Sequence, residues 1–207
     1  MRMDRTFLES AFRLLAQKLD ETNIHCRICV YDGAALVYAY RLRGMSMDVD
    51  YRIISLDSET VPQDEMIATV RKLIRQTGTE LGLSPDWMND GVKGFVSTKE
   101  EYSEGLAFGC HIVPALEIVF PSPEYLLAMK CVAMRNTSES PHDRNDILKL
   151  AEMAGIADAE AVLDLVQRFY PLGRLAPRVE FGVRELLDRA ASEEEMEVEN
   201  DADVPGI

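Results

Sequence analysis

The spacing of apolar residues changes along this chain, and that change limits the folds it can adopt. Strand-like alternation of apolar and polar residues is found before residue 121, and helical spacing dominates the rest of the sequence. The pattern predicts an α+β fold, in which helices flank a small mixed sheet and a helical region follows. We expect the first region to span residues 1–121 and the second to span residues 122–191.

The same spacing, with glycine and proline as breaks, predicts the individual elements. In the first region we expect helices over 4–20, 34–40 and 64–78, and strands over 24–31, 47–56, 105–112 and 115–120. The last two strands should form a hairpin, residues 41–46 a polar bend, and residues 81–94 a loop. In the second region the predicted helices are 123–135, 143–155, 158–169 and 177–191.

Acidic residues are concentrated at the end of the chain. Seven of them lie after Ser192 without any Lys or Arg, and they supply half of the formal net charge of −14. We therefore expect residues 192–207 to be a disordered acidic tail. Because phosphate contacts need clustered cations, a chain this acidic is a poor general binder of nucleic acid.

The sequence shows neither a signal peptide nor a membrane-spanning segment, and this bears on where in the cell we expect the protein. The chain opens on an amphipathic stretch instead of a signal-peptide apolar region, and its longest apolar run is interrupted by His111, Pro114 and Glu117. We expect no membrane contact. Four cysteines without a secretion signal favour reduced thiols in the cytoplasm.

Cys26 and Cys29 form a CxxC pair, which is typical of zinc or redox sites. The surrounding residues alternate as in a strand, so an odd separation turns the two thiols to opposite faces. No second CxxC follows, and Cys110 with His111 is a weak complement. We interpret both cysteines as structural.

Asp48 and Asp50 form the sharpest local feature, a DxD pair in the predicted 47–56 strand. Side chains two apart share one face of a strand, so the two carboxylates should lie roughly 6–7 Å apart. Such carboxylates repel each other unless a cation neutralises them, and oxygen ligands suit Mg²⁺ or Mn²⁺. The alternative is an exposed strand face with two solvated acids.

A glycine turn precedes the DxD pair. Gly33, Ala34 and Ala35 lie between the predicted 24–31 strand and a short helix, and a glycine at such a turn lets a triphosphate approach the backbone. This arrangement is suited to binding phosphate and a metal ion: a strand is followed by a glycine turn and a helix, and two acids come on the next strand. Together with three later segments, this arrangement covers residues 32–36, 43–50, 83–90, 122–130 and 143–147.

In order and spacing, these segments resemble the nucleotidyltransferase superfamily that includes DNA polymerase β. Within it, the chain is most similar to the bacterial AbiEii/MenT-like toxin branch and its uncharacterised relatives. The resemblance implies that the first region is a nucleotidyltransferase-like core. It also implies that Asp48 and Asp50 bind catalytic Mg²⁺ or Mn²⁺ and that Lys130 and Asp143 complete the catalytic site. Nucleotide-binding residues are then Gly33, Ala34, Arg43 and Ser46.

Each residue outside the DxD pair has a competing interpretation. Lys130 has apolar neighbours three and four positions away, so it should be paired or bound to an anion, or else extend to the edge of an apolar stripe. Asp143 is also well placed as an N-cap, with Asp146 in the first turn. Glu117 is a candidate third metal ligand or an exposed strand residue. The roles of Glu117 and Asp146 stay open.

Asp32 departs from the family pattern, which has glycine at this position. A carboxylate beside the phosphate turn repels a triphosphate unless a metal or Arg41 or Arg43 compensates. Two functions therefore follow. The first is a magnesium-dependent enzyme that moves a nucleotidyl group from a nucleoside triphosphate to an acceptor. The alternative is an inactive interaction or nucleotide-sensing module on the same fold.

The resemblance also implies partners. Members of the branch act in toxin–antitoxin pairs and phage defence, and some modify tRNA, so an RNA or protein acceptor and a cognate antitoxin are implied here. The compact basic patch formed by Arg71, Lys72 and Arg75 is the surface we would assign to RNA. A solvated helix face is the alternative.

Overall fold

The computed structural model describes residues 2–103, 114–134, 141–171 and 177–202. It divides into two compact units, which we describe separately. The sheet unit comprises Met1–Val96 and Glu100–Ser122, and the helical unit comprises Ser97–Lys99 and Pro123–Ile207. The predicted α+β class is confirmed, because helices flank a small mixed sheet. The predicted division at 121/122 did not anticipate that residues 97–99 join the helical unit.

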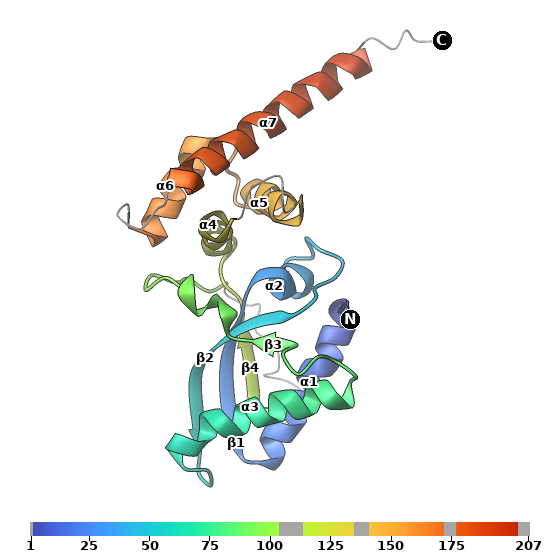
Figure 1. Ribbon diagram of the computed structural model, residues 1–207, viewed down its shortest axis with the longest axis vertical. Coiled ribbons are helices and arrows are strands. Elements are labelled where there is room, and N and C mark those ends of the chain that lie inside the picture. The colour runs from blue at the N-terminus through green and yellow to red at the C-terminus, as the bar shows by residue number, and fades with distance from the viewer. Residues whose placement is uncertain (1, 104–113, 135–140, 172–176, 203–207) are drawn as a thin grey trace. The chain divides into compact units, whose positions relative to one another are not determined.

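Four strands form the sheet among the described residues: β1 (Ile24–Val30), β2 (Val49–Ser58), β3 (Met88–Asn89) and β4 (Leu116–Val119). Their order is β3-β2-β1-β4 (Figure 1). β1 is antiparallel to β2 and parallel to β4, and β2 is parallel to β3. β4 therefore confirms the strand expected over 115–120. Its expected hairpin partner, 105–112, lies outside the described residues.

Two amphipathic helices, α1 (Arg5–Glu21) and α3 (Gln63–Glu80), contact each other and pack against the sheet (Figure 1). The side chain of Asp4 caps α1 by accepting a hydrogen bond of 2.8 Å from the backbone N–H of Phe7. Lys18 Nζ lies 2.6 Å from Glu80 Oε1 and links the two helices. Leu8, Phe12 and Leu15 of α1 are buried, and so are Val70 and Ile74 of α3, which begins and ends close to its predicted limits.

The segment between β1 and β2 differs from the prediction at both of its ends. Helix α2 (Asp32–Tyr38) begins two residues before the expected start at residue 34. β2 begins at Val49, so Asp48 precedes the strand and does not belong to it. The predicted 81–94 loop contains β3 and a short 3-10 helix, η1 (Gly91–Gly94). Trp87 directly precedes β3. Its buried Nε1 donates a hydrogen bond of 2.9 Å to the carbonyl of Ile74, which fixes the start of β3 to α3.

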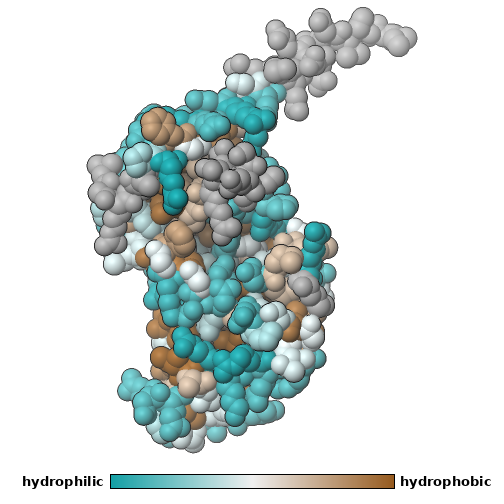
Figure 2. Space-filling view, viewed as in Figure 1, coloured by the Kyte–Doolittle hydropathy of each residue, from teal (hydrophilic) through white to brown (hydrophobic). Residues whose placement is uncertain are grey.

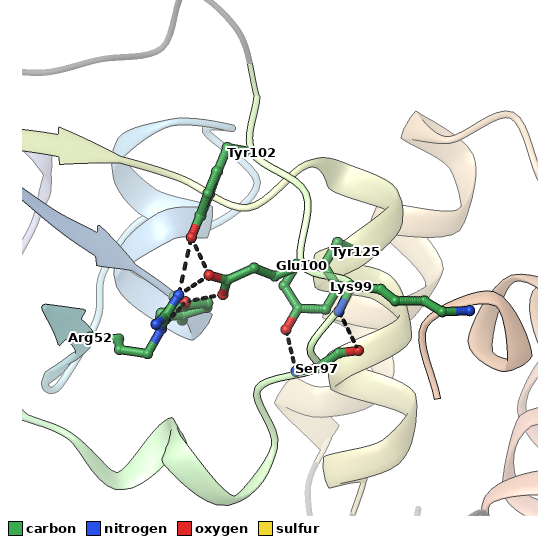
Figure 3. A network of polar contacts seen from close by, with 7 residues as sticks. Arg52, Ser97, Lys99, Glu100, Tyr102 and Tyr125 are labelled. Carbon is green, nitrogen blue, oxygen red and sulfur yellow. Dashed lines mark hydrogen bonds and ion pairs between the residues drawn. The ribbon is translucent and has the colours of Figure 1, made fainter. Parts of the chain in front are cut away.

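The helical unit contains α4 (Pro123–Ala133), α5 (Pro141–Met153), α6 (Ala159–Phe169) and α7 (Pro177–Ala202) (Figure 1). The connector residues 97–99 are fixed to this unit. Ser97 Oγ donates to the carbonyl of Phe169 at 2.5 Å. Its backbone N–H donates to Tyr125 Oη at 2.8 Å (Figure 3). Because Ser97 is buried, both hydrogen bonds are shielded from water.

Helix α7 contradicts the expected disorder after Ser192, because it continues to Ala202. Extending an existing helix adds a hydrogen bond for each residue fixed, and the Glu, Met and Ala of this segment are good helix formers. Glu193 supports the extension, because its carboxylate lies 2.7 Å from Arg144 on α5 and 2.9 Å from Arg189 one turn earlier. The prediction rested on the acidic composition of the segment and did not take these two arginines into account. Residues 203–207 lie outside the described part.

Among the described residues, no helix combines the length and the apolar composition that crossing a bilayer requires. Most of the surface visible in Figure 2 is hydrophilic, with apolar residues scattered between. In the part of the chain that the structure describes, the large exposed apolar side chains are Met45, Met47, Ile67, Phe95, Met153 and Phe181. Scattered exposure of this kind is normal for a folded chain.

Candidate functional site

The two acids of the DxD pair lie at the entrance to β2. Asp48 is exposed just before the strand, Asp50 is half-buried within it, and Val49 between them is fully buried. Two backbone hydrogen bonds fix this stretch: Val49 N–H donates to the carbonyl of Trp87 at 2.7 Å, and Tyr31 N–H donates to the carbonyl of Asp50 at 2.9 Å. The acids therefore flank a buried anchor, and the backbone that carries them is held from both sides.

Gly33 faces two of the residues predicted to bind nucleotide. A Cβ at this position would lie 2.6 Å from Ser46 Oγ and 2.8 Å from Arg43 Nη1. Both distances are shorter than a real Cβ tolerates, so any larger residue here would force Ser46 and Arg43 to shift. Gly33, Arg43 and Ser46 thus form one cluster in the sheet unit.

Ser46 connects this cluster to the DxD pair. Its hydroxyl donates a hydrogen bond of 2.8 Å to the carbonyl of Asp48, and its side chain is buried. Its backbone forms a two-way bridge with Met3, through hydrogen bonds of 2.8 and 2.9 Å. The loop before β2 is consequently pinned to the N-terminal segment, to Gly33 and to Asp48.

Asp32 and Ala34 occupy the predicted phosphate turn in different ways. Asp32 has a φ of +48°, in the left-handed region that favours glycine and that Asp and Asn tolerate better than most residues. This is a conformation that glycine adopts more readily than any other residue. Ala34 is buried inside α2. Since α2 spans only Asp32–Tyr38, the helix end by itself does not define a phosphate site.

Asn89 joins the surroundings of Asp50, and the sequence reasoning did not select it. Asp50 and Asn89 are register partners in the parallel β2–β3 pair. A Cβ at Gly91 would lie 2.8 Å from Asn89 Oδ1 and 3.6 Å from Asp50 Oδ1, so both oxygens border the same glycine. Asn89 Oδ1 also accepts the backbone N–H of Gly91 at 2.8 Å.

The donor set near β2 fits a hard divalent cation. It consists of carboxylate oxygens, and Mg²⁺ commonly uses one or two carboxylates together with water and substrate phosphates instead of a cage of protein ligands. Within the described ranges, no group of three or more His, Cys, Asp or Glu side chains is placed to hold a metal ion. Asp48 and Asp50 would therefore depend on phosphate oxygens to complete a metal's coordination.

A second polar network lies on β2 and was not predicted. Arg52 forms an ion pair with Glu100, and its Nη2 donates to Tyr102 Oη at 3.1 Å (Figure 3). Tyr31 Oη donates to Glu100 Oε2 at 2.8 Å and accepts from Arg52 Nε at 3.4 Å. Arg52 follows Asp50 by two residues, so strand alternation alone could have placed the two side chains on the same face of β2. Glu100 comes from a connector with no such pattern.

Lys130 and Asp143 belong to the helical unit. Lys130 Nζ lies 2.9 Å from Asp146 Oδ2 and 3.5 Å from Asp143 Oδ1. The expectation that Lys130 is paired is confirmed. The N-cap interpretation of Asp143 is wrong, because α5 begins at Pro141 and places Asp143 in its first turn. Asp146 then falls in the second turn, where its side chain is buried against Lys130.

Two further candidates are engaged elsewhere. Glu117 Oε1 lies 3.2 Å from Arg27 Nε, and the two are register partners in the β1–β4 pair. On α3, the exposed Arg71 lies 3.0 Å from Asp90, which also pairs with Lys93. The basic patch of Arg71, Lys72 and Arg75 is therefore partly neutralised.

The described thiols are buried. Desolvation raises the pKa of Cys26 and of Cys29 to about 12, although hydrogen bonding to Tyr31 and the charges of Arg52 and Arg27 oppose the shift at Cys29. Metal binding and redox exchange use the thiolate. Thiols that resist ionisation favour the structural interpretation.

The sheet unit thus brings together Gly33, Arg43, Ser46 and Asp48, and Asp50 follows two residues after Asp48, within β2. Lys130 and Asp143 contact each other within the helical unit. That the two groups form one site stays a prediction. Comparison with protein-family models, curated proteins and solved structures found no match to this chain.

Proposed function

We propose that this protein is a cytoplasmic, magnesium-dependent nucleotidyltransferase that moves a nucleotidyl group from a nucleoside triphosphate to an acceptor. One observation carries the proposal. Ser46 contacts the Cβ position of Gly33 through the same hydroxyl that hydrogen-bonds the backbone of Asp48. A glycine turn and a pair of acids, separate in sequence, are held by one buried side chain.

The acids supply the negative charge that such a reaction needs to hold a cation. Asp48 and Asp50 would bind Mg²⁺ or Mn²⁺ through their carboxylate oxygens. A metal bound there neutralises triphosphate charge and lowers the pKa of a hydroxyl or water coordinated to it. The exposed position of Asp48 supports access by a substrate, and the half-buried position of Asp50 supports a fixed orientation.

Cations near the glycine turn would balance the phosphates. Arg43 places its Nη1 beside Gly33, where an extended guanidinium suits phosphate oxygens. Lys130 would act on the leaving pyrophosphate, and Asp143 would support the metal or act as the base toward the acceptor. Asp143 is more exposed than Asp146, at 28% against 3% of its side chain, which favours Asp143 as the group that meets solvent or substrate.

The alternative is an inactive interaction or nucleotide-sensing module, and one observation favours it. The close packing of Gly33 against Ser46 and Arg43 gives the glycine a structural role that needs no nucleotide. Asp32 adds a carboxylate to the same turn. A chain that kept this fold after losing catalysis would preserve the same contacts.

An RNA acceptor and an antitoxin partner remain part of the proposal. The exposed residues Lys72 and Arg75 on α3 would contribute to RNA contact, whereas Arg71 is already paired with Asp90. An assay that follows label from each of the four nucleoside triphosphates into total tRNA would test the acceptor directly.

A thermal-shift experiment tests the site. The four nucleoside triphosphates are added with Mg²⁺ or Mn²⁺ to the wild type, to Asp48→Ala and to Asp50→Ala. Asp57→Ala is the matched control, because Asp57 is an exposed acid at the far end of the same strand. A ligand that binds the native state raises its melting temperature by mass action.

We expect a metal-dependent rise with one or more triphosphates that both site variants lose and the control retains. Binding without transfer to any acceptor would favour the sensing module. If Asp48→Ala keeps both metal and nucleotide affinity, the assignment of the metal site is wrong.

A further inference from the structure

Arg52 shares a face of β2 with Asp50. Residues two apart in a strand point to the same side, and the burial of β2 follows this rule at its start, where Val49 and Tyr51 are buried and Asp50 and Arg52 are half-buried. Side chains so spaced start roughly 6–7 Å apart. Arg52 therefore starts beside Asp50, one of the two acids proposed to bind the metal.

The network around Arg52 holds its guanidinium by one edge. Nε contacts Tyr31, and Nη2 contacts Tyr102 and Glu100. An arginine carries five N–H donors, and these contacts use those of Nε and Nη2. Among the described residues, no hydrogen bond or ion pair engages the two donors of Nη1, and 32% of the Arg52 side chain is exposed.

The phenols make this arrangement more than a simple ion pair. Both tyrosine hydroxyls donate to Glu100, whose side chain is only 12% exposed. Burial raises the pKa of Tyr31, so its phenol stays protonated and remains a donor at neutral pH. Because Glu100 receives three donors, its charge is well compensated, and Arg52 is fixed with one edge turned away from its partners.

We propose that Arg52 is a phosphate-binding residue of the nucleotide site, in which its Nη1 edge contacts the triphosphate held at Asp48 and Asp50. The inference rests on the proposed function and adds a residue to it. A guanidinium already ordered by three partners loses little side-chain entropy on binding an anion, and its planar donors match phosphate oxygens. Tyr31 ties the residue to the site, since its backbone N–H also binds the carbonyl of Asp50.

Arg27 provides a matched control within the same sheet. It also pairs with a glutamate, Glu117, at 3.2 Å, and 42% of each side chain is exposed. Its register partner on β2 is Ser55, however, whereas the register partner of Arg52 on β1 is Cys29. Arg27 therefore lies further along the sheet from Asp50 and should not contact the same ligand.

The test compares four variants by calorimetric titration with Mg²⁺ and the triphosphate that binds the wild type best, and separately with inorganic tripolyphosphate. The variants are Arg52→Gln, Glu100→Gln, the double variant that combines them, and Arg27→Gln. The double variant removes both charges together, so that neither is left buried without a partner.

We expect Arg52→Gln and the double variant to bind triphosphate about 10- to 100-fold more weakly, which corresponds to the loss of a charged hydrogen bond. Glu100→Gln should bind as tightly as the wild type or more tightly, because it removes a nearby negative charge. Arg27→Gln should be unchanged. A purely structural network predicts instead that Arg52→Gln and Glu100→Gln lose affinity to the same degree, and that result would overturn the proposal.

The two ligands separate this inference from the proposed function. Triphosphate binding that is insensitive to Arg52→Gln overturns the role of Arg52 and leaves the nucleotidyltransferase standing. Tripolyphosphate binding that depends on Arg52, without any nucleotide binding, supports the anion site and contradicts the nucleotidyltransferase. A wild type that binds neither ligand overturns both proposals.

Discussion

The ammonium nitrogen of Lys130 on α4 lies 2.9 Å from Oδ2 of Asp146 on α5, and only 7% and 3% of these side chains are exposed. Asp143 approaches the same nitrogen at 3.5 Å from a more exposed position. The pair joins two helices of the helical unit through charge in a buried place. Because an ion pair that is removed from water must compensate for its lost hydration, each partner depends on the other.

Replacing Asp146 by Ala should destabilise the protein by about 3–5 kcal/mol, since it leaves Lys130 buried without its closest counter-charge. Urea denaturation followed by circular dichroism measures this loss. The control is Asp143→Ala, which should cost less than about 1 kcal/mol, as is typical of a partly exposed pair. A double variant, Lys130→Met with Asp146→Leu, should recover most of the stability. Equal losses in Asp146→Ala and Asp143→Ala would contradict this ranking.

Replacing Gly33 by Ala should destabilise the sheet unit by about 1–3 kcal/mol, because the new methyl group meets Ser46 Oγ and Arg43 Nη1. The arginine end can swing away, but the serine hydroxyl can move only by giving up its hydrogen bond to Asp48. We therefore expect Ser46→Ala to rescue part of the loss in a double-mutant cycle measured by thermal denaturation. Strict additivity of the two changes would show that Ser46 does not limit the space at residue 33.

The buried thiols should make the protein less stable in strong base. Burial raises the pKa of Cys26 and Cys131 from the ordinary 9.0 to about 12, so the folded chain keeps these thiols neutral while the unfolded chain ionises them. Stability is fully present below pH 9 and falls as the pH rises toward 12. Denaturation midpoints between pH 8 and 11 measure this fall. In a Cys110→Ser background, a thiol reagent should react far more slowly with native than with unfolded protein, and rapid native reaction would contradict the burial.

Asp90 predicts an acid-sensitive contribution of the opposite sign. The hydrogen bond from Lys93, with added attraction from Arg71, lowers the pKa of Asp90 below its ordinary 3.8. Its stabilisation is present above pH 3.8 and is lost as the pH falls further. Asp90→Asn should cost less than about 1 kcal/mol at pH 7, because 40% of the Asp90 side chain is exposed and its ion pairs are therefore screened by water. The difference from the wild type should vanish in strong acid and shrink in 1 M salt. A difference that persists at low pH would show another role for Asp90.

Much of the fold follows from local sequence patterns. Helix α1 and its cap at Asp4, α6 and its cap at Asp158, and strand β1 lie close to their predicted limits, because apolar spacing and capping residues act over a few neighbouring positions. The errors occur where contacts from elsewhere decide. β2 starts after Asp48, where the serine turn ends, and α7 is supported by Arg144 from another helix.

The candidate site divides in the same way. Spacing alone selected Gly33, Asp48 and Asp50 as a group, and the sheet unit supplies a physical link between them through Ser46. Spacing gave no access to Asn89, which reaches Asp50 through the β2–β3 register, or to Glu100, which reaches Arg52 from a connector. A residue brought in by strand pairing or by a loop leaves no periodic signal near the residue it contacts.

The sequence by itself determined most of the segments that become helices and strands, roughly where they begin, and which acids and glycine lie close together in the chain. Only the tertiary structure decided that Ser46 connects Gly33 to Asp48 and that Lys130 forms its ion pair with Asp146. It also decided that Arg52 is held by Glu100 and two tyrosines. The physical reason is the distance along the chain over which each kind of interaction acts. Backbone preference and apolar periodicity act between near neighbours, whereas the partner of a buried polar group is set by packing between segments distant in sequence.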